Sequence, residues 1–194
     1  MATKRLFFSC VVLIALTGAG TALWGQTGGF AYVVNNSSND VSAYSIDGTT
    51  GVLTPVAGSP FSTDFFPFSV TVDPTGRFAY VVNGFAAGTV SAFAIDQSTG
   101  ALTPVVGSPF PAGWGPTSVT TSVTVDPTGQ FAYVANCASA CGAFGPGNVS
   151  AYTIDGTTGA LTPVNGSPFP AGEGPFSVTT TAGPPPPPAR QDRP

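Results

Sequence analysis

The chain has 194 residues, of which 42 % are hydrophobic and only 7 % are charged, and its formal net charge is −4. This length allows one domain or a short array of repeats. Because the few basic residues form no patch, the composition excludes the usual electrostatic footprint of a nucleic-acid-binding protein. It also argues against an anionic membrane surface as a partner.

Residues 1–25 have the pattern of an export signal. Lys4 and Arg5 form the positive start, the apolar run Leu6–Leu16 follows, and residues 20–22 (GTA) are small, as at a cleavage site. The apolar run is shorter than the roughly 20 residues that span a membrane. We therefore expect a cleaved signal peptide and an exported chain that is periplasmic, extracellular or on the cell surface, with no membrane contact after cleavage. An uncleaved anchor is the alternative.

A unit of about 50 residues then occurs three times. Its copies begin at Phe30, Phe78 and Phe131 with FAYVVN or FAYVAN, and continue with VSAYSI, VSAFAI or VSAYTI. An Asp, a Thr-Gly turn, LTPV and GSPF follow in each copy. Aromatic and β-branched residues fill the short segments, and Gly, Pro, Asn and Asp separate them, which is typical of strands and tight turns. Each copy therefore predicts four short strands.

A first strand precedes the FAYVVN strand in the unit. We predict it at Phe68–Val72, at 118–125 and at 176–180. DPTG turns at 73–76 and 126–129 lead from the first strand into the second. Pro presets φ for such a turn, and Gly supplies the positive φ that closes it.

The second strand is apolar on both of its faces. Phe78, Tyr80 and Val82 alternate with Ala79 and Val81. A sheet that is wetted on one side would alternate apolar with polar residues. We therefore expect each sheet to be packed between neighbours, large side chains against small ones.

The order of the strands predicts how the ends meet. The repeat region, residues 26–182, begins with a second strand and ends with a first strand at Phe176–Ala182. We predict an all-β, β-propeller-like fold of three four-stranded antiparallel blades, in which the last strand completes the first blade. Residues 183–194, which include Pro184–Pro188, are predicted to form a proline-rich disordered tail.

The repeated FAYVVN, VSAYxID, TGxLTPVxGSPF and SVTVDPTG motifs resemble the YVTN-type β-propeller repeat. They are also similar to the bacterial seven-bladed lactonase family, whose named activity is hydrolysis of 6-phosphogluconolactone. The resemblance covers residues 30 to 182. It implies a propeller fold and, as an activity, lactone hydrolysis.

Three units fall short of the roughly 4–8 blades that close a propeller ring. We therefore expect either two chains that pair head to tail into a six-bladed ring by exchanging end strands, or further blades from a longer gene. An open stack of three sheets and an unusually small ring are the remaining alternatives.

The side chains available for catalysis are few. The sequence has no histidine, one glutamate and no lysine outside residues 1–25. This removes Ser-His-Asp and Cys-His catalysis and every His-ligated metal site. A phosphorylated substrate favours cationic clamps, and Arg77 is the only basic residue in the repeats. We expect no cofactor and no metal, and no catalytic residue is assigned.

Five aspartates recur in turns, three after the third strand and two at the start of DPTG (Asp47, Asp96, Asp155, Asp73 and Asp126). Calcium binding or carboxylate catalysis is one interpretation. We expect the other, in which each carboxylate accepts N–H groups of its own turn, because every one lies beside turn residues.

Four residues are candidates for contact with a carbohydrate or protein ligand. Asn35, Asn83 and Asn136 end the second strand of each unit, where they either line a central funnel or cap the strand. Trp114 lies in a loop, where it either stacks on a sugar ring or packs beneath the loop.

Cys137 and Cys141 lie in an insertion that only the third unit has. In an exported protein a local disulfide between them is the expected outcome. A metal site would need two further ligands, and the sequence offers none nearby.

We interpret the chain as an exported propeller-repeat protein that acts as a binding or structural module rather than as an enzyme on its own. The alternative is a lactone hydrolase of the 6-phosphogluconolactonase-like family, acting as an incomplete propeller or as part of an oligomeric ring.

Overall fold

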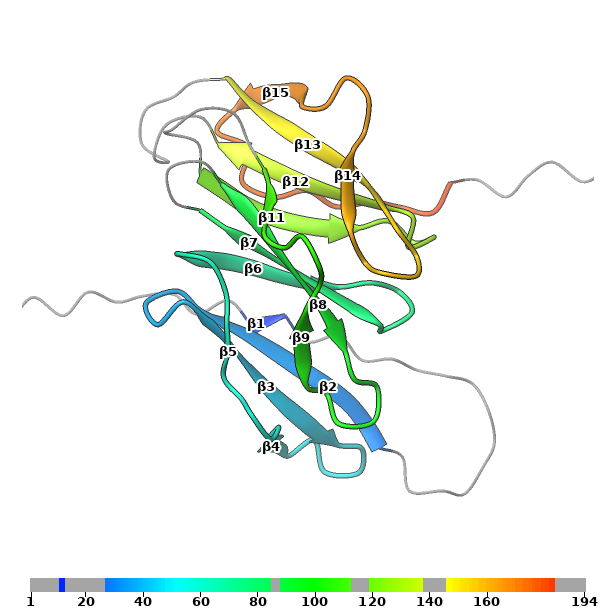
Figure 1. Ribbon diagram of the computed structural model, residues 1–194. Helices are drawn as coiled ribbons and strands as arrows, with labels where there is room; N and C mark the ends of the chain where they lie inside the picture. The colour runs from blue at the N-terminus through cyan, green and yellow to red at the C-terminus, as the bar shows by residue number, and fades with distance from the viewer. Residues whose placement is uncertain (1–10, 13–26, 85–87, 113–118, 138–145, 184–194) are drawn as a thin grey trace, which may run out of the picture.

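The computed structural model describes residues 11–12, 27–84, 88–112, 119–137 and 146–183. Over these ranges the chain contains strands and turns and no helix. The strands form three antiparallel sheets that lie one above another, from the blue first sheet to the yellow and orange third sheet (Figure 1). The prediction of an all-β, propeller-like stack of three sheets is confirmed, and we call the sheets the first, second and third blades.

The first blade contains β1 (Val11–Val12), β2 (Thr27–Asn35), β3 (Asp40–Asp47), β4 (Leu53–Pro55) and β5 (Phe61–Ser62). The second blade contains β6 (Pro67–Val72), β7 (Phe78–Asn83), β8 (Thr89–Ile95), β9 (Leu102–Pro104) and β10 (Phe110–Pro111). The third blade contains β11 (Val119–Val125), β12 (Phe131–Cys137), β13 (Pro146–Ile154), β14 (Leu161–Pro163) and β15 (Phe169–Glu173).

The predicted fourth strand of each blade is divided into two short strands. In the second blade, β9 pairs with one end of β8 and β10 pairs with the other end. The GSP segment between them bends the chain, and its Ser108–Pro109 peptide bond is cis. The Ser108 hydroxyl oxygen accepts the N–H of Ala92 in β8 at 2.9 Å. Ser59 and Ser167 accept the N–H groups of Ala43 and Ala151 in the same way, both at 2.9 Å. The serine of the GSPF motif therefore holds the divided fourth strand against the third strand in each blade.

The DPTG turns are held by their aspartates. Asp73 Oδ1 accepts the N–H groups of Arg77 and Phe78, both at 2.8 Å. Gly76 has a φ of 72°, which is the left-handed region that a glycine adopts without strain. The turn therefore follows from its sequence, and it delivers the chain into the buried strand β7.

Two apolar clusters join the blades. Between the first and second blades, Tyr32 and Val34 pack with Ala79 and Val81. All four side chains are at most 5 % exposed. Burial of a valine side chain contributes about 1.5–3 kcal/mol to the free energy of folding. The apolar clusters therefore stabilise the packing of one sheet on the next.

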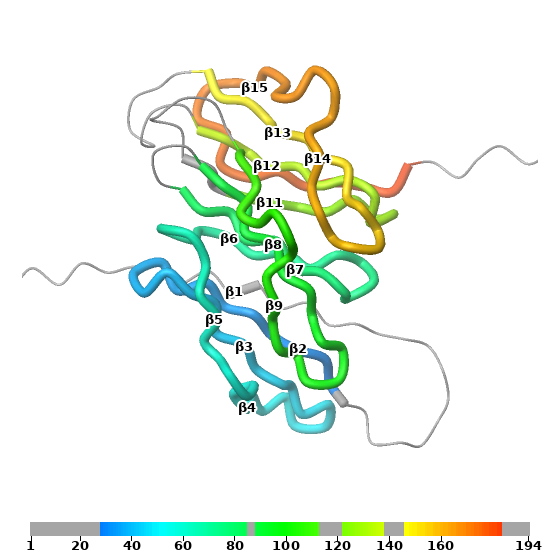
Figure 2. Tube along the Cα trace, viewed as in Figure 1, coloured from blue at the N-terminus to red at the C-terminus, as the bar shows by residue number. Residues whose placement is uncertain are grey.

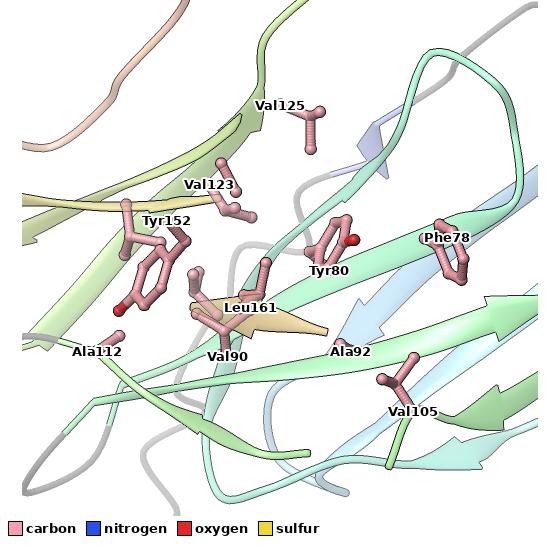
Figure 3. Close-up of a cluster of buried hydrophobic side chains, with 13 residues drawn as sticks. Phe78, Tyr80, Val90, Ala92, Val105, Ala112, Val123, Val125, Tyr152 and Leu161 are labelled. Atoms are coloured by element: carbon pink, nitrogen blue, oxygen red, sulfur yellow. The ribbon is translucent and has the colours of Figure 1, made fainter. Parts of the chain in front are cut away.

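The second cluster repeats the arrangement one blade further on. Tyr80 and Val82 of β7 pack with Ala132 and Val134 of β12. Figure 3 shows other members of this cluster around Tyr80, among them Val123 and Leu161. In both clusters a tyrosine of one blade packs with an alanine of the next, and valines lie on both sides. The expected packing of large against small side chains is therefore found for the tyrosines and alanines.

A polar contact completes each of these clusters. The Tyr32 hydroxyl donates to the Gly100 carbonyl at 3.0 Å, and the Tyr80 hydroxyl donates to the Gly159 carbonyl at 3.1 Å. Burial raises the pKa of both tyrosines, so they remain protonated donors. A Cβ at Gly159 would lie 2.3 Å from the ring of Phe78, which leaves room only for glycine.

The prediction that Phe176–Ala182 completes the first blade is wrong for this chain. These residues form no strand, and the Thr180 hydroxyl donates to the Val125 carbonyl of β11 at 3.2 Å. The free edge of β2 is instead paired with β1, with Val11 opposite Val33. The physical reason is distance, because the first and third blades lie at opposite ends of the stack (Figure 1).

Other parts of the predicted domain plan lie outside the described residues. Apart from Val11–Val12, the predicted signal peptide at 1–25 is not described, and neither are residues 184–194 of the predicted tail. Both assignments stay predictions.

Candidate functional site

A polar network recurs where the second strand of each blade ends. Asn83 is 1 % exposed, and its Nδ2 donates to Ser91 Oγ at 2.9 Å and to Thr89 Oγ1 at 3.1 Å. Asn136 is 0 % exposed and donates in the same way to Ser150 Oγ and Asn148 Oδ1. These hydrogen bonds tie the second strand to the third strand.

The first blade has the same network with a charged member. Asn35 Nδ2 donates to Ser42 Oγ at 2.8 Å and to Asp40 Oδ1 at 2.6 Å. The three asparagines that sequence reasoning singled out therefore have a structural role within their own blades. Their contact with a ligand stays a prediction. The buried Oδ1 of Asn136 accepts no hydrogen bond from the described residues, so an acceptor atom remains there.

Asp64 joins this network in the second blade. It lies between β5 and β6, and its Oδ2 accepts the hydroxyl of Thr89 at 2.8 Å. Its Oδ1 accepts the N–H of Phe65, also at 2.8 Å, and its own N–H donates to Ser91 Oγ at 3.3 Å. The loop that leaves the first blade thus places a carboxylate beside Asn83.

Exposed aromatic residues follow Asp64 directly in the sequence. Phe65, Phe66 and Phe68 are 65 %, 41 % and 42 % exposed. Phe66 has a φ of 55°, which is unusual for a residue other than glycine, and its N–H donates to Asn39 Oδ1 at 2.8 Å. We call residues 64–68, of which the last two begin β6, the aromatic loop. A carboxylate with exposed rings is a combination that suits a sugar-like ligand, because rings stack on apolar sugar faces.

Sequence reasoning missed Asp64. The repeat alignment did contain a signal, because the positions equivalent to Asp64 are Gly113 and Gly172. A carboxylate that the other copies lack is not required by the turn itself.

Comparison with known proteins adds the family. The model of the family described as "Lactonase, 7-bladed beta-propeller" matches residues 17–120, which is more than half of the chain. The chain belongs to the seven-bladed lactonase family. The resemblance seen in the repeated motifs is therefore confirmed, whereas the search of curated proteins gives no match.

Solved structures of lactonase-like propellers share the fold. One is a protein from Bacteroides fragilis NCTC 9343, provisionally assigned as a 6-phosphogluconolactonase, with a TM-score of 0.60 and 21 % identity over 77 % of this chain. Another is the periplasmic gluconolactonase PpgL from Pseudomonas aeruginosa, with a TM-score of 0.56 and 19 % identity over 71 % of this chain. The matches cover 38 % and 37 % of those proteins, so the chain spans less than two fifths of their length.

The recurring aspartates of this lactonase-family chain are engaged in their own turns, as expected. Asp47 Oδ1 accepts the N–H groups of Thr50 and Thr49 at 2.7 and 3.0 Å, and these bonds hold its pKa below the ordinary value. Hydrogen bonds from Ser98 lower the pKa of Asp96 in the same way. Such carboxylates stay ionised and are poor proton donors near neutral pH.

Arg77 is also engaged within the fold. Its Nη2 donates to the Gly156 carbonyl at 2.6 Å, and its guanidinium lies 5.3 Å from the centre of the Phe78 ring. It therefore links the second blade to a turn of the third blade. A phosphate group would have to compete for this cation.

The remaining predicted site residues are only partly placed. Cys137 is buried at the end of β12, whereas Cys141 and Trp114 lie outside the described residues. The disulfide and the contact of Trp114 with a ligand stay predictions.

Within the described ranges, no three His, Cys, Asp or Glu side chains gather into a group that could hold a metal ion. The same ranges contain no helix that is long and apolar enough to cross a membrane.

Proposed function

We propose that this chain is an exported lactone hydrolase of the seven-bladed lactonase family, whose active surface is completed by further blades. The observation that supports the proposal most is the family match over residues 17–120, which includes the aromatic loop. The export signal pattern of residues 1–25 supports export, and PpgL is itself named as periplasmic. The proposal therefore prefers the hydrolase to the binding module, which the repeat pattern and the scarcity of catalytic side chains had suggested.

The proposed substrate class is an uncharged sugar lactone. Arg77 is the one basic residue between residues 27 and 183, and its guanidinium already donates to Gly156. A phosphorylated lactone favours a cationic clamp of Arg or Lys. An unphosphorylated lactone needs only hydrogen bonds and a stacking surface, which the aromatic loop offers.

Asp64 is the residue that we assign to the chemistry. In lactone hydrolysis, water adds to the carbonyl carbon, the ring C–O bond breaks, and the proton lost by water ends on the leaving oxygen to give a hydroxy acid. A carboxylate beside the lactone accepts the proton of the water and returns it to the leaving oxygen. The hydroxyl of Thr89 orients the Asp64 carboxylate for this role.

The test is a pH-stat assay of acid release from glucono-δ-lactone by the full chain, with the spontaneous rate subtracted. We expect turnover that Asp64→Asn lowers by about 100-fold or more, the usual contribution of a general base. The matched control is Asp155→Asn, which changes a turn carboxylate of the third blade. No turnover above the spontaneous rate, or an equal loss in both variants, would contradict the proposal.

The binding or structural module remains the second candidate. The observation in its favour is that most described carboxylates accept hydrogen bonds from their own turns. Calorimetric titration with gluconolactone and with gluconate separates the two candidates. Saturable binding without turnover favours the module.

A further inference from the structure

Each internal blade contact follows one rule. A blade presents the Phe and Tyr of its second strand, and the next blade presents the Gly and Leu that open its fourth strand. Tyr80 donates to Gly159 across this contact, and Leu161 is only 5 % exposed within it. Tyr32 and Leu102 form the same contact one blade earlier.

The first blade presents the Gly and Leu half of this contact to solvent. Val52 and Leu53 are 60 % and 44 % exposed, although the equivalent Leu102 is 5 % exposed. Gly51 has the same left-handed conformation as its counterparts, with a φ of 72°. A Cβ at Gly51 would meet nothing within 4 Å. The first blade therefore leaves space beside Gly51 for an aromatic side chain, and no described residue of the chain occupies that space.

The third blade presents the other half. Ala132 and Val134 of β12 pack towards the second blade, so Phe131 and Tyr133 point to the opposite face by strand alternation. Both are partly exposed. They stand in β12 where Phe78 and Tyr80 stand in β7, and they carry the same ring and hydroxyl.

A second hydrogen bond distinguishes the two ends in the same way. The Tyr152 hydroxyl of the third blade donates to the Pro111 carbonyl of the second blade at 2.6 Å. Tyr44 is the equivalent of Tyr152 in the first blade and is partly exposed. Pro170 is the equivalent of Pro111 in the third blade and is exposed. Tyr44 belongs to β3 and Pro170 to β15, and these two strands lie at opposite ends of the stack (Figure 2).

The strands at the two ends also match. Residues 176–180 (FSVTT) repeat the sequence of β6 (FSVTV) but form no strand in this chain. Among the described residues, the edge of β2 pairs with Val11–Val12, and Val11 is opposite Val33 in register as Val70 is opposite Val81 in the second blade. Both residues of β1 belong to the predicted signal peptide, so its cleavage would open this edge to a strand of the 176–180 type.

We propose that two copies of this chain pair head to tail, with the third blade of each packed on the first blade of the other. In each contact Phe131 and Tyr133 of one copy pack against Gly51 and Leu53 of the other. Residues 176–180 of the first copy add to the edge of β2 in the second. Two such contacts give a ring of six blades, within the roughly 4–8 that propellers use.

A second copy is the partner that fits, because both halves of the contact lie on the same chain. The surfaces differ from each other, so the contact is head to tail and not two-fold symmetric in itself. The two ends carry the Phe, Tyr, Gly and Leu positions that form the contacts between the three blades.

The test is the mass of the full exported chain by light scattering after gel filtration. We expect about twice the single-chain mass of 19.4 kDa, less the cleaved leader. Leu53→Asp and Tyr133→Asp each place a charge in the contact, and each should give a monomer. The control Val106→Asp changes a residue that is 93 % exposed in the second blade and should stay dimeric. Far-UV circular dichroism confirms that all variants fold.

Mixing the two monomeric variants gives the decisive result. Leu53→Asp retains an intact third-blade end, and Tyr133→Asp retains an intact first-blade end. We expect the mixture to form a one-to-one dimer through the single intact contact. A monomeric parent chain, a mixture that stays monomeric, or an open polymer would each overturn the proposal. The measurement needs no catalytic activity, so its outcome is independent of the lactonase assay.

Discussion

At the scale of single residues, one pairing of glycine with aromatic rings recurs between the blades. Gly100 and Gly159 have φ values of 77° and 76°, and each carbonyl accepts the hydroxyl of a tyrosine in the preceding blade. The positive φ turns the carbonyl towards that tyrosine, and the missing side chain lets a Phe ring lie against the turn. Both properties belong to glycine alone.

Gly159→Ala should therefore destabilise the chain much more than Gly51→Ala. Both glycines have positive φ, but a Cβ at Gly159 would lie 2.3 Å from the Phe78 ring and one at Gly51 would meet nothing. Overpacking costs about 1–3 kcal/mol, and we expect this difference in the free energy of unfolding. Urea titrations of both variants in a Leu53→Asp background measure it without any contribution from self-association. Equal losses in the two variants would contradict the packing argument.

A turn carboxylate makes stability depend on pH. Hydrogen bonds from the Ser98 hydroxyl and the N–H groups of Ser98 and Thr99 lower the pKa of Asp96. A lowered folded-state pKa gives stability that is present above the unfolded pKa of about 3.9 and is lost as the pH falls through the folded value.

Asp96→Asn should accordingly lower the melting temperature at pH 7 and leave it nearly unchanged at pH 2. As the pH falls through the lowered pKa, the parent carboxylate gains a proton and comes to resemble the amide, so the difference between the two proteins shrinks at low pH. Thermal melts followed by circular dichroism at the two pH values test this. The same decrease at both values would show that charge has no part in the turn.

At the scale of strands and turns, the local elements could be predicted from sequence, because local chemistry determines them. Asp73 and Gly76 define the DPTG turn, and alternation in FAYVV predicts a strand that is buried on both faces. The division of the fourth strand was missed. It depends on Ser108 reaching the N–H of Ala92, which lies 16 residues away.

The candidate site was less predictable than the strands. Asn35 and Asn83 end their strands and Asn136 is the last residue but one of β12. Their hydrogen bonds go to serines of the VSA motif, such as Ser91 and Ser150, and the motif alone did not indicate that these hydroxyls accept the asparagine amides. Asp64 was missed because it belongs to no repeated turn. The position of Phe176–Ala182 was also predicted wrongly, because its pairing depends on the distance between blades at opposite ends of the stack.

At the scale of the whole molecule, the apolar contacts among the described residues connect blades that are neighbours in sequence. The apolar clusters join the first blade to the second and the second to the third. In such a stack, stability is approximately a sum of blade terms and nearest-neighbour contact terms. Each end face then lacks the stabilising free energy that a neighbouring blade would contribute. Because the two end faces are complementary, packing one against the other would supply that free energy.

The tyrosine hydroxyls test this additivity and the assembly together. Tyr32→Phe and Tyr80→Phe each remove one hydrogen bond to a buried carbonyl, and each should cost about 0.5–1.5 kcal/mol of unfolding free energy. Because the bonds lie in different blade contacts, the double variant should lose the sum to within roughly 0.5 kcal/mol.

Tyr133→Phe should cost nothing in a monomeric Leu53→Asp background, where its hydroxyl has no second copy to meet. In the parent chain it should weaken the dimer, as sedimentation equilibrium measures. A loss of stability in the monomer, or an unchanged dimer affinity, would show that the hydroxyl of Tyr133 acts within its own blade.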